Sequence, residues 1–272
     1  MEQAAVKHTG MIGLGAMGLQ MARHMALKGF EVYGCDLDVK AARQAESHGV
    51  RICATPAEVG RHAEVVLVMV ATDQQIADVV ERSGLLDTLA RGSVVCIASS
   101  CTPETVQRMA KLAEAKGIGV LDTPLVLGQE AANNGAATAY VGGDEQSFAK
   151  AKSVLAAFSE KVLHLGPVGT GQIAKTINNM LLWACMAANF ETLTLAKKLG
   201  ADIPKLTEAL MHGSGANWSL SRWGKSTGKW AEKDMDVALE LAQAAKVPVP
   251  LGGLVDQLIK TINQDKMKAL LS

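Results

Sequence analysis

The stretch Met11-Ile12-Gly13-Leu14-Gly15-Ala16-Met17-Gly18 decides the fold of this chain. Its three glycines have the spacing GxGxxG, and Asp36 ends the next β-rich run. Between a strand and a helix, these glycines allow a tight turn, a close approach of backbone to pyrophosphate, and close packing of the helix. The helix N-terminus favours phosphate, and an acid at the second strand end accepts hydrogen bonds from ribose hydroxyls. The stretch therefore predicts a dinucleotide site formed by residues 13–18 and Asp36.

The first 165 residues alternate between short β-rich apolar runs and amphipathic helical patterns. Such alternation predicts βαβ units, and hence a doubly wound, mostly parallel sheet with helices on both faces. The expected strands are residues 9–14, 31–35, 65–70, 94–98, 119–122, 138–141 and 162–165. The expected helices between them include residues 18–28, 39–48, 73–81 and 105–116.

The pattern changes after Gly166, where helical signals replace the alternation. Residues 172–198 contain neither proline nor glycine and form one amphipathic run. A helix of that length would extend about 40 Å at 1.5 Å per residue, too long for a sheet crossover. We therefore expect an α/β domain over residues 1–166 and an all-helical domain over residues 167–272. Further helices are expected at residues 204–211, 234–245 and 251–272.

Composition limits the classes of function. The chain has 272 residues, 49% of them hydrophobic, and its formal net charge is zero. Neutrality disfavours nucleic acid as a partner, and no apolar run reaches the roughly 20 residues that span a membrane. The histidines and the five cysteines are dispersed without metal-ligand spacing, which predicts no metal site and reduced thiols in a cytoplasmic protein. The cysteines are Cys35, Cys53, Cys96, Cys101 and Cys185.

Two further segments lie where a cofactor would bind, at the carboxyl ends of strands. Val70 and Ala71 follow the expected fourth strand, and Ser99 and Ser100 follow the fifth. Each serine is also well placed to cap the helix that begins near Pro103. Taken singly, the serines favour the capping interpretation.

Lys175 and Asn179 lie four residues apart in an otherwise apolar part of the expected long helix, and therefore on one face of it. Isolated polar groups are costly to bury, so these two side chains require an explanation. Spacing alone favours a solvated stripe on an amphipathic helix over a reactive site.

Four motifs in order resemble those of the β-hydroxyacid dehydrogenase family, which includes 3-hydroxyisobutyrate dehydrogenase, tartronate semialdehyde reductase and L-threonate dehydrogenase. Residues 12–18 are similar to the cofactor loop of that family, and residues 122–128 to its substrate loop, usually DAPVSGG. The glycine-rich turn at residues 166–171, continuing through Lys175 to Asn179, resembles its catalytic helix. Lys233, followed by Asp234, resembles its second lysine. The resemblance extends over nearly the whole chain.

The resemblance implies a Rossmann domain and a long helix that leads into an all-α domain of the 6-phosphogluconate dehydrogenase-like type. It makes Lys175 the general acid/base and gives Asn179 the role of orienting the substrate. It places Val70, Ala71, Ser100 and Lys233 against the cofactor, and it implies a homodimer or homotetramer. The substrate-binding residues that it implies are Pro124, Leu125, Val126, Leu127, Gly128, Lys175 and Asn179.

Two departures from the family pattern bear on the substrate. Val126-Leu127 stands where the family has Ser-Gly, which removes a hydroxyl donor from a carboxylate site. Gln129 and Asn133 are candidates to replace it, although both also fit as ordinary loop and helix residues. The segment from Asn217 to Lys233 is shorter than in the family, and it contains Trp218, Trp223 and Trp230. We expect these tryptophans to fill the core; walling a less polar pocket is the alternative.

The leading hypothesis is an NAD-dependent oxidoreductase acting on a small 3-hydroxyacid or semialdehyde. Asp36 favours NAD over NADP because it repels a 2′-phosphate, and Leu37 offers no charge to bind one. An imine reductase-like enzyme is one alternative, against which the retained Lys175 argues. A cofactor-binding protein with a lost substrate site is another, supported by the altered substrate loop.

Overall fold

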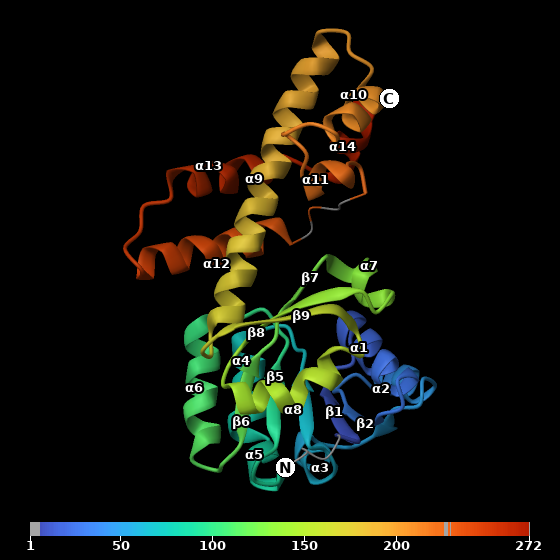
Figure 1. The fold of residues 1–272 in the computed structure, drawn as a ribbon, viewed down its shortest axis with the longest axis vertical. Coiled ribbons are helices and arrows are strands. Elements are labelled where there is room, and N and C mark those ends of the chain that lie inside the picture. Colours follow the sequence, from blue (N-terminus) through green and yellow to red (C-terminus); the bar gives the residue numbers. More distant parts are fainter. Residues whose placement is uncertain (1–5, 226–227, 229, 272) are drawn as a thin grey trace. The chain divides into compact units, whose positions relative to one another are not determined.

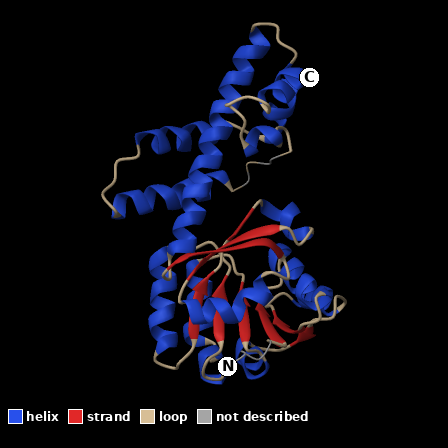
Figure 2. Cartoon of the chain, viewed as in Figure 1, coloured by secondary structure: helices blue, strands red, loops and turns tan. Residues whose placement is uncertain are grey.

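The computed structural model describes residues 6–225, 228 and 230–271 of the chain. Contacts divide the chain into two compact units, the first ending at Lys175 and the second beginning at Thr176. The first unit combines a sheet with helices, and the described residues of the second form helices joined by loops, with no strand among them (Figure 2).

A sheet with the strand order β3-β2-β1-β4-β5-β6-β8-β7 forms the centre of the first unit (Figure 1). The six strands from β3 to β6 pair in parallel, which confirms the expected doubly wound parallel sheet. β8 then runs antiparallel to β6 and β7, and β9 pairs in parallel with β8, so the sheet is mixed. The strands are β1 (His8–Ile12), β2 (Glu31–Cys35), β3 (Arg51–Ile52), β4 (Val65–Val68), β5 (Val94–Ile97), β6 (Gly119–Asp122), β7 (Leu125–Val126), β8 (Ala137–Gly142) and β9 (Ser159–Gly166).

The central strand β4 shows why the sheet is covered on both faces. All four of its residues are fully buried, and successive side chains of a strand point to opposite faces. Val65 and Leu67 pack in one hydrophobic cluster, whereas Val66 and Val68 pack in another. A strand buried on both sides is continuously apolar rather than alternating, as the sequence of β4 is.

Helices connect these strands, and most of them begin at a side-chain cap. Asp38, Thr55, Thr72, Thr102 and Asp144 each accept a hydrogen bond from a backbone N–H in the first turn of the helix that follows. Such caps satisfy donors that have no partner within the helix. The helices are α1 (Ala16–Leu27), α2 (Val39–Glu46), α3 (Pro56–His62), α4 (Asp73–Ala77), the π-helical η1 (Asp78–Arg82), α5 (Leu85–Thr88), α6 (Pro103–Glu114), α7 (Gly128–Asn133) and α8 (Glu145–Leu155).

The long helix α9 (Thr170–Lys198) has 29 residues and confirms the long helix expected from the sequence. The boundary between the two compact units falls within it, between Lys175 and Thr176. Its first turns therefore belong to the first unit, and the rest of the helix to the second.

The second unit packs its helices around one apolar core. Trp183, Met186 and Leu193 of α9 enter this core, together with Met235 and Ile259 from later helices. The residues expected to form one helix from position 251 onward form two. Asn263 accepts the backbone N–H of Lys266 at 2.9 Å and so begins a new helix. The helices after α9 are α10 (Ile203–Leu210), α11 (Trp218–Ser221), α12 (Ala231–Ala244), α13 (Pro250–Ile259) and α14 (Gln264–Leu271).

The expectation that three tryptophans fill the core is right only for Trp223. Trp223 is 7% exposed, whereas Trp218 is 44% and Trp230 59% exposed. Sequence spacing could not separate them, because all three lie in short or irregular segments without a helical period. All five cysteines are free thiols. No helix among the described residues has the length and apolar character needed to cross a membrane.

Candidate functional site

The glycine loop between β1 and α1 has the backbone shape that its glycines permit. Gly13 has φ +88°, and a Cβ there would lie 2.1 Å from Met69 O. A Cβ on Gly18 would lie 1.9 Å from Gly13 O, so the first turn of α1 packs directly on the loop. At Gly15, by contrast, a Cβ would meet nothing within 4 Å. Two glycines thus allow close packing, and the third leaves room for a ligand beside the helix N-terminus.

Asp36 lies directly after β2 and ties the loop to that strand. Its Oδ2 accepts the Leu14 N–H at 2.5 Å, and its Oδ1 accepts the Asp38 N–H at 2.8 Å. The residue is only half-buried. Since a carboxylate has about four acceptor positions, Asp36 orders the loop and still has capacity to accept hydroxyl groups of a ligand.

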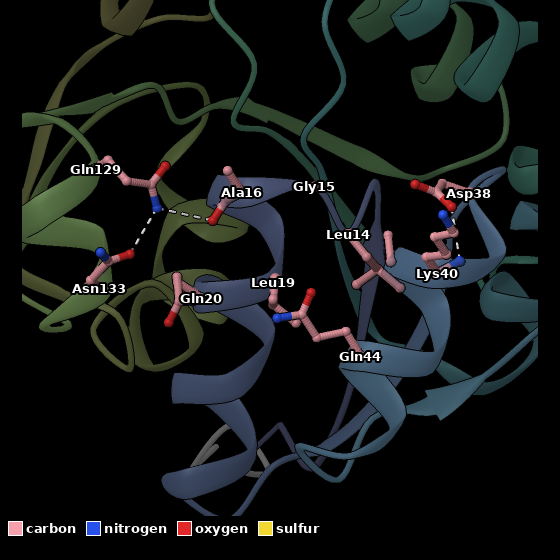
Figure 3. A pocket seen from close by; sticks show the side chains of 11 residues that line it. Leu14, Gly15, Ala16, Leu19, Gln20, Asp38, Lys40, Gln44, Gln129 and Asn133 are labelled. Carbon is pink, nitrogen blue, oxygen red and sulfur yellow. Dashed lines mark hydrogen bonds between the residues drawn. The ribbon is translucent and has the colours of Figure 1, made fainter. Parts of the chain in front are cut away.

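An open pocket of about 440 Å³ lies beside this loop (Figure 3). Gln129 of α7 donates to Ala16 O at 3.0 Å and to Asn133 Oδ1 at 2.8 Å. The bond to Ala16 O holds α7 against the first turn of α1, and the bond to Asn133 lies within α7. The residues that line the pocket include Leu14 and Gly15 from the loop, Asp38 and Lys40 at the start of α2, and Gln129 and Asn133 from α7.

The chain segments that follow β4 and β5 are joined by Ser99. The Val70 N–H donates to Ser99 Oγ at 2.7 Å, and Ser99 is buried, whereas Ser100 is exposed. The helix after β5 is capped by Thr102, which accepts the Thr105 N–H. The expectation that Ser99 or Ser100 caps this helix is therefore wrong. Thr102 adjoins Pro103 and is the residue in position to do so.

The carboxylate of Asp122, at the end of β6, receives the first turn of α9. Its Oδ1 accepts the Gly169 N–H at 2.7 Å, and its Oδ2 accepts the Gln172 N–H at 2.8 Å. The residue is 0% exposed, and a Cβ on Gly142 or Gly171 would lie within 2.7 Å of one of its oxygens. Burial raises the pKa of the Asp122 carboxyl, while the backbone N–H groups act in the opposite direction. Asp122 thus fixes the start of the long helix.

Lys175 lies one turn further along α9, with its side chain half-buried. Its Nζ donates to Leu125 O at 2.9 Å. In the second unit, Asn179 is 5% exposed and accepts a hydrogen bond from Asn178 Nδ2 at 3.1 Å. Spacing alone favoured a solvated stripe on this face of the helix, but the structure half-buries Lys175 and buries Asn179.

The substrate loop suggested by the sequence divides into a buried and an exposed part. The side chains of Pro124, Leu125 and Val126 are buried. Leu127 is 41% exposed and has φ +77°, a left-handed conformation that costs a branched L-residue roughly 1–2 kcal/mol. Gly128 follows with φ +75°. Leu127 therefore occupies a backbone shape suited to glycine.

Lys233 belongs to the second unit, in the first turn of α12. The neighbouring Asp234 accepts a hydrogen bond from Trp183 Nε1 at 3.0 Å, which ties α12 to α9. Within the described residues, no three His, Cys, Asp or Glu side chains are grouped so that they could hold a metal ion.

Two features that organise the site were not predicted from the sequence. One is the burial of Gln172, and the other is the structural role of Asp122. Gln172 is 1% exposed and bonds to the backbone at both Ser99 and Cys101. The burial of a glutamine in an amphipathic helix cannot be predicted from the residues around it. Asp122 stood inside a recognised motif, but its partners lie 47 and 50 residues away.

The fold and the glycine loop together define a dinucleotide-binding protein. Residues 8–166 match the family described as the NAD binding domain of 6-phosphogluconate dehydrogenase. Residues 169–270 match the family described as the NAD-binding of NADP-dependent 3-hydroxyisobutyrate dehydrogenase. The two matches together span nearly all of the described chain.

Individual relatives agree with these matches. The chain is 33% identical to 3-hydroxyisobutyrate dehydrogenase of Pseudomonas aeruginosa, over 91% of this chain and 89% of that protein. It is 30% identical to the human mitochondrial 3-hydroxyisobutyrate dehydrogenase, over 92% of this chain and 80% of that protein. A structure of Mycobacterium tuberculosis 3-hydroxyisobutyrate dehydrogenase with L-serine superposes with a TM-score of 0.87 at 25% identity, covering 98% of this chain and 100% of that one.

The chain belongs to the 3-hydroxyisobutyrate dehydrogenase-like β-hydroxyacid dehydrogenase family. It is an NAD(P)-dependent oxidoreductase of the 3-hydroxyacid dehydrogenase type. The open face at Gly15 and the half-buried carboxylate of Asp36 fit the pyrophosphate and ribose of such a cofactor.

Proposed function

We propose that this protein interconverts a small 3-hydroxyacid and the corresponding semialdehyde, with NAD as its cofactor and Lys175 as the general acid/base. The observation that carries the proposal is the hydrogen bond from Lys175 Nζ to Leu125 O at 2.9 Å. This bond holds an amine beside β7, shortly after the carboxyl end of β6, and ligands of doubly wound folds bind at the carboxyl ends of strands.

The proposed role of Lys175 is to exchange a proton with the substrate oxygen. When bound, the nicotinamide supplies or accepts the hydride. A carbonyl oxygen that gains negative charge is stabilised by a nearby ammonium, which then protonates it. In the oxidative direction the neutral amine takes the proton from the hydroxyl. An ammonium has three N–H donors, and the bond to Leu125 O fixes the direction of the side chain. Asn179, one turn further along α9, is proposed to orient the substrate.

Two features support NAD as the preferred cofactor. Asp36 places a negative charge where the 2′-phosphate of NADP would have to lie. Leu37 is fully exposed and offers no positive charge to bind that phosphate. Val70, Ala71, Ser100 and Lys233 remain proposed cofactor contacts.

The sequence of the substrate loop supports weaker binding of a substrate carboxylate than in relatives that have serine at this site. The Val126 side chain is buried and has no hydroxyl. Gln129 cannot supply the missing donor, because both N–H groups of its amide are used, one on Ala16 O and one on Asn133 Oδ1. The small acid is therefore proposed to be held by backbone groups of this loop and by Asn179.

The experiment that tests the proposal compares wild type with Lys175→Ala on a panel of 3-hydroxyacids, semialdehyde acids and cyclic imines. Turnover of the best hydroxyacid should fall by about 10²–10⁴-fold in the variant, while NADH binding, followed by fluorescence titration, should persist. Lys198→Ala, at an exposed position near the far end of α9, is the matched control and should retain turnover. Turnover of imines alone would favour an imine reductase. NADH binding by wild type without any turnover would favour a cofactor-binding protein.

We further propose a homodimer or homotetramer. Ile173, Ile177 and Leu181 recur every fourth residue on α9 and are 47%, 50% and 63% exposed. An apolar stripe of this kind is typical of a surface that another chain covers. Light scattering on the purified protein should give at least twice the mass of 28.6 kDa.

A further inference from the structure

Gln172 is a buried amide whose two ends are both engaged. The residue is 1% exposed. Its Nε2 donates to Ser99 O at 2.8 Å, and its Oε1 accepts the Cys101 N–H at 3.2 Å. The side chain therefore hydrogen-bonds to the backbone on both sides of Ser100, in the segment that follows β5.

A further hydrogen bond links this segment to the one that follows the neighbouring strand β4. Ser99 Oγ accepts the Val70 N–H at 2.7 Å, which ties the segment after β4 to Ser99. The backbone carbonyl of the same serine accepts the hydrogen bond from Gln172. The segments after β4 and β5 are those proposed to contact the cofactor. Both are thus linked through one serine to one glutamine of α9.

The same turn of α9 is fixed from a third direction. The Gln172 N–H donates to Asp122 at the end of β6, and three residues later Lys175 Nζ donates to Leu125 O. Residues three apart in a helix are neighbours on its surface. Gln172 is therefore the side chain that connects the helical turn carrying Lys175 to the strand ends on the cofactor side.

We propose that Gln172 is a positioning residue that sets the separation between the cofactor-contacting segments and Lys175 Nζ. The proposal rests on the proposed function, because it concerns the geometry of that reaction. Transfer between cofactor, substrate and amine depends on sub-ångström placement, and a displacement of about 1 Å can cost 10²-fold in rate. Gln172 touches neither reactant in this account and acts through the backbone at Ser99 and Cys101.

Gln172→Glu tests this role separately from stability. When protonated, the glutamic acid has one O–H to donate to Ser99 O and one oxygen to accept the Cys101 N–H, as the amide does. When ionised, it has no donor, and an oxygen faces Ser99 O. Burial and the nearby Asp122 carboxylate both favour the protonated form, whereas the Lys175 ammonium favours the ionised form. The ratio of variant to wild-type kcat should therefore rise as the pH is lowered.

Gln172→Leu removes both hydrogen bonds at every pH. We expect its kcat to fall by about 10–100-fold, with a smaller effect on KM for the hydroxyacid and no recovery at low pH. Gln146→Leu is the matched control, because Gln146 is an exposed glutamine of α8 and the same deletion there should leave kcat unchanged. Circular dichroism at each pH confirms that each variant is folded.

Two results would overturn the positioning role. One is a Gln172→Leu enzyme that melts at a lower temperature but keeps kcat within twofold of wild type. The other is a Gln172→Glu to wild-type ratio that does not change with pH. A wild-type enzyme that turns over no hydroxyacid would instead overturn the proposed function, and that outcome is visible before any variant is compared.

Discussion

Asp36 directly follows β2 and Asp122 ends β6 of the same sheet, and each accepts backbone N–H groups with both of its oxygens. Asp36 is half-buried and bonds to the glycine loop and to the start of α2. Asp122 is fully buried and bonds to the first turn of α9. The same local arrangement thus leaves one carboxylate partly accessible, where we propose that it binds the cofactor, and buries the other within the framework; exposure separates the two.

The largest effect expected from this comparison is on stability. Asp122→Asn should lower the free energy of unfolding by about 3 kcal/mol, because one carboxamide oxygen replaces two acceptors and its NH2 group faces a backbone donor. Urea titration of wild type and variant measures the loss. Asp36→Asn is the matched control and should lose about 1 kcal/mol, since water can reach its unpaired groups.

The pH dependence of the Asp122→Asn effect sharpens the test. A carboxyl whose folded-state pKa is raised binds protons more tightly in the folded chain than in the unfolded one. The advantage of wild type over the variant should therefore narrow as the pH rises above the ordinary aspartate pKa of 3.8. A widening advantage would show that the backbone donors outweigh burial at Asp122.

A smaller effect is expected at Asp36, on cofactor preference. Asp36→Ala should shift the ratio of kcat/KM for NAD over NADP by at least about 10-fold towards NADP, equivalent to about 1.4 kcal/mol. The variant loses the charge that is proposed to repel a 2′-phosphate, and Lys40 lines the pocket beside the glycine loop. Initial rates with each cofactor measure the shift. An unchanged ratio would remove Asp36 from cofactor selection.

The smallest effect is expected at a third aspartate, Asp144, which is exposed and caps α8 by accepting the Ser147 N–H at 2.8 Å. Burial acts to raise the pKa of its carboxyl, but hydrogen bonds from Ser147 lower it overall. Asp144→Ala should cost about 1 kcal/mol of stability near neutral pH. Because the pKa is lowered, this contribution should disappear as the pH falls through and below 3.8, the opposite sign to Asp122. Thermal unfolding across the acid range measures it, and equal slopes for the two aspartates would contradict the contrast.

Much of the parallel part of the sheet could be read from the sequence. β4 and β5 are continuous apolar runs of four residues, and β1, β2 and β6 are short β-rich runs between helical patterns. β2 and β6 begin and end where expected. β3 and β7 could not be found, since two residues carry no period, and their pairing depends on neighbouring strands. The antiparallel direction of β8 could not be predicted from its own sequence either, because the direction of a strand depends on the connections on both sides of it.

The candidate site was predictable where a motif is local and not where it depends on distant chain segments. The spacing of Gly13, Gly15 and Gly18 specifies their packing roles within one turn. The partners of Gln172 lie 71 and 73 residues earlier in the chain. No local pattern could indicate that this amide, rather than an exposed one, is buried against two strand ends.

The partners of Asp122 also bear on how the nucleotide-binding half could exist alone. The family match for that half ends at residue 166, but both donors to Asp122 lie at or beyond Gly169. A chain that emerges from the ribosome only as far as β9 would carry a buried, unpaired carboxylate at the end of β6. Autonomous folding of this half therefore has to wait for the opening turns of the long helix, and a gene fragment intended to encode it should run to Lys175 rather than stop at Gly166.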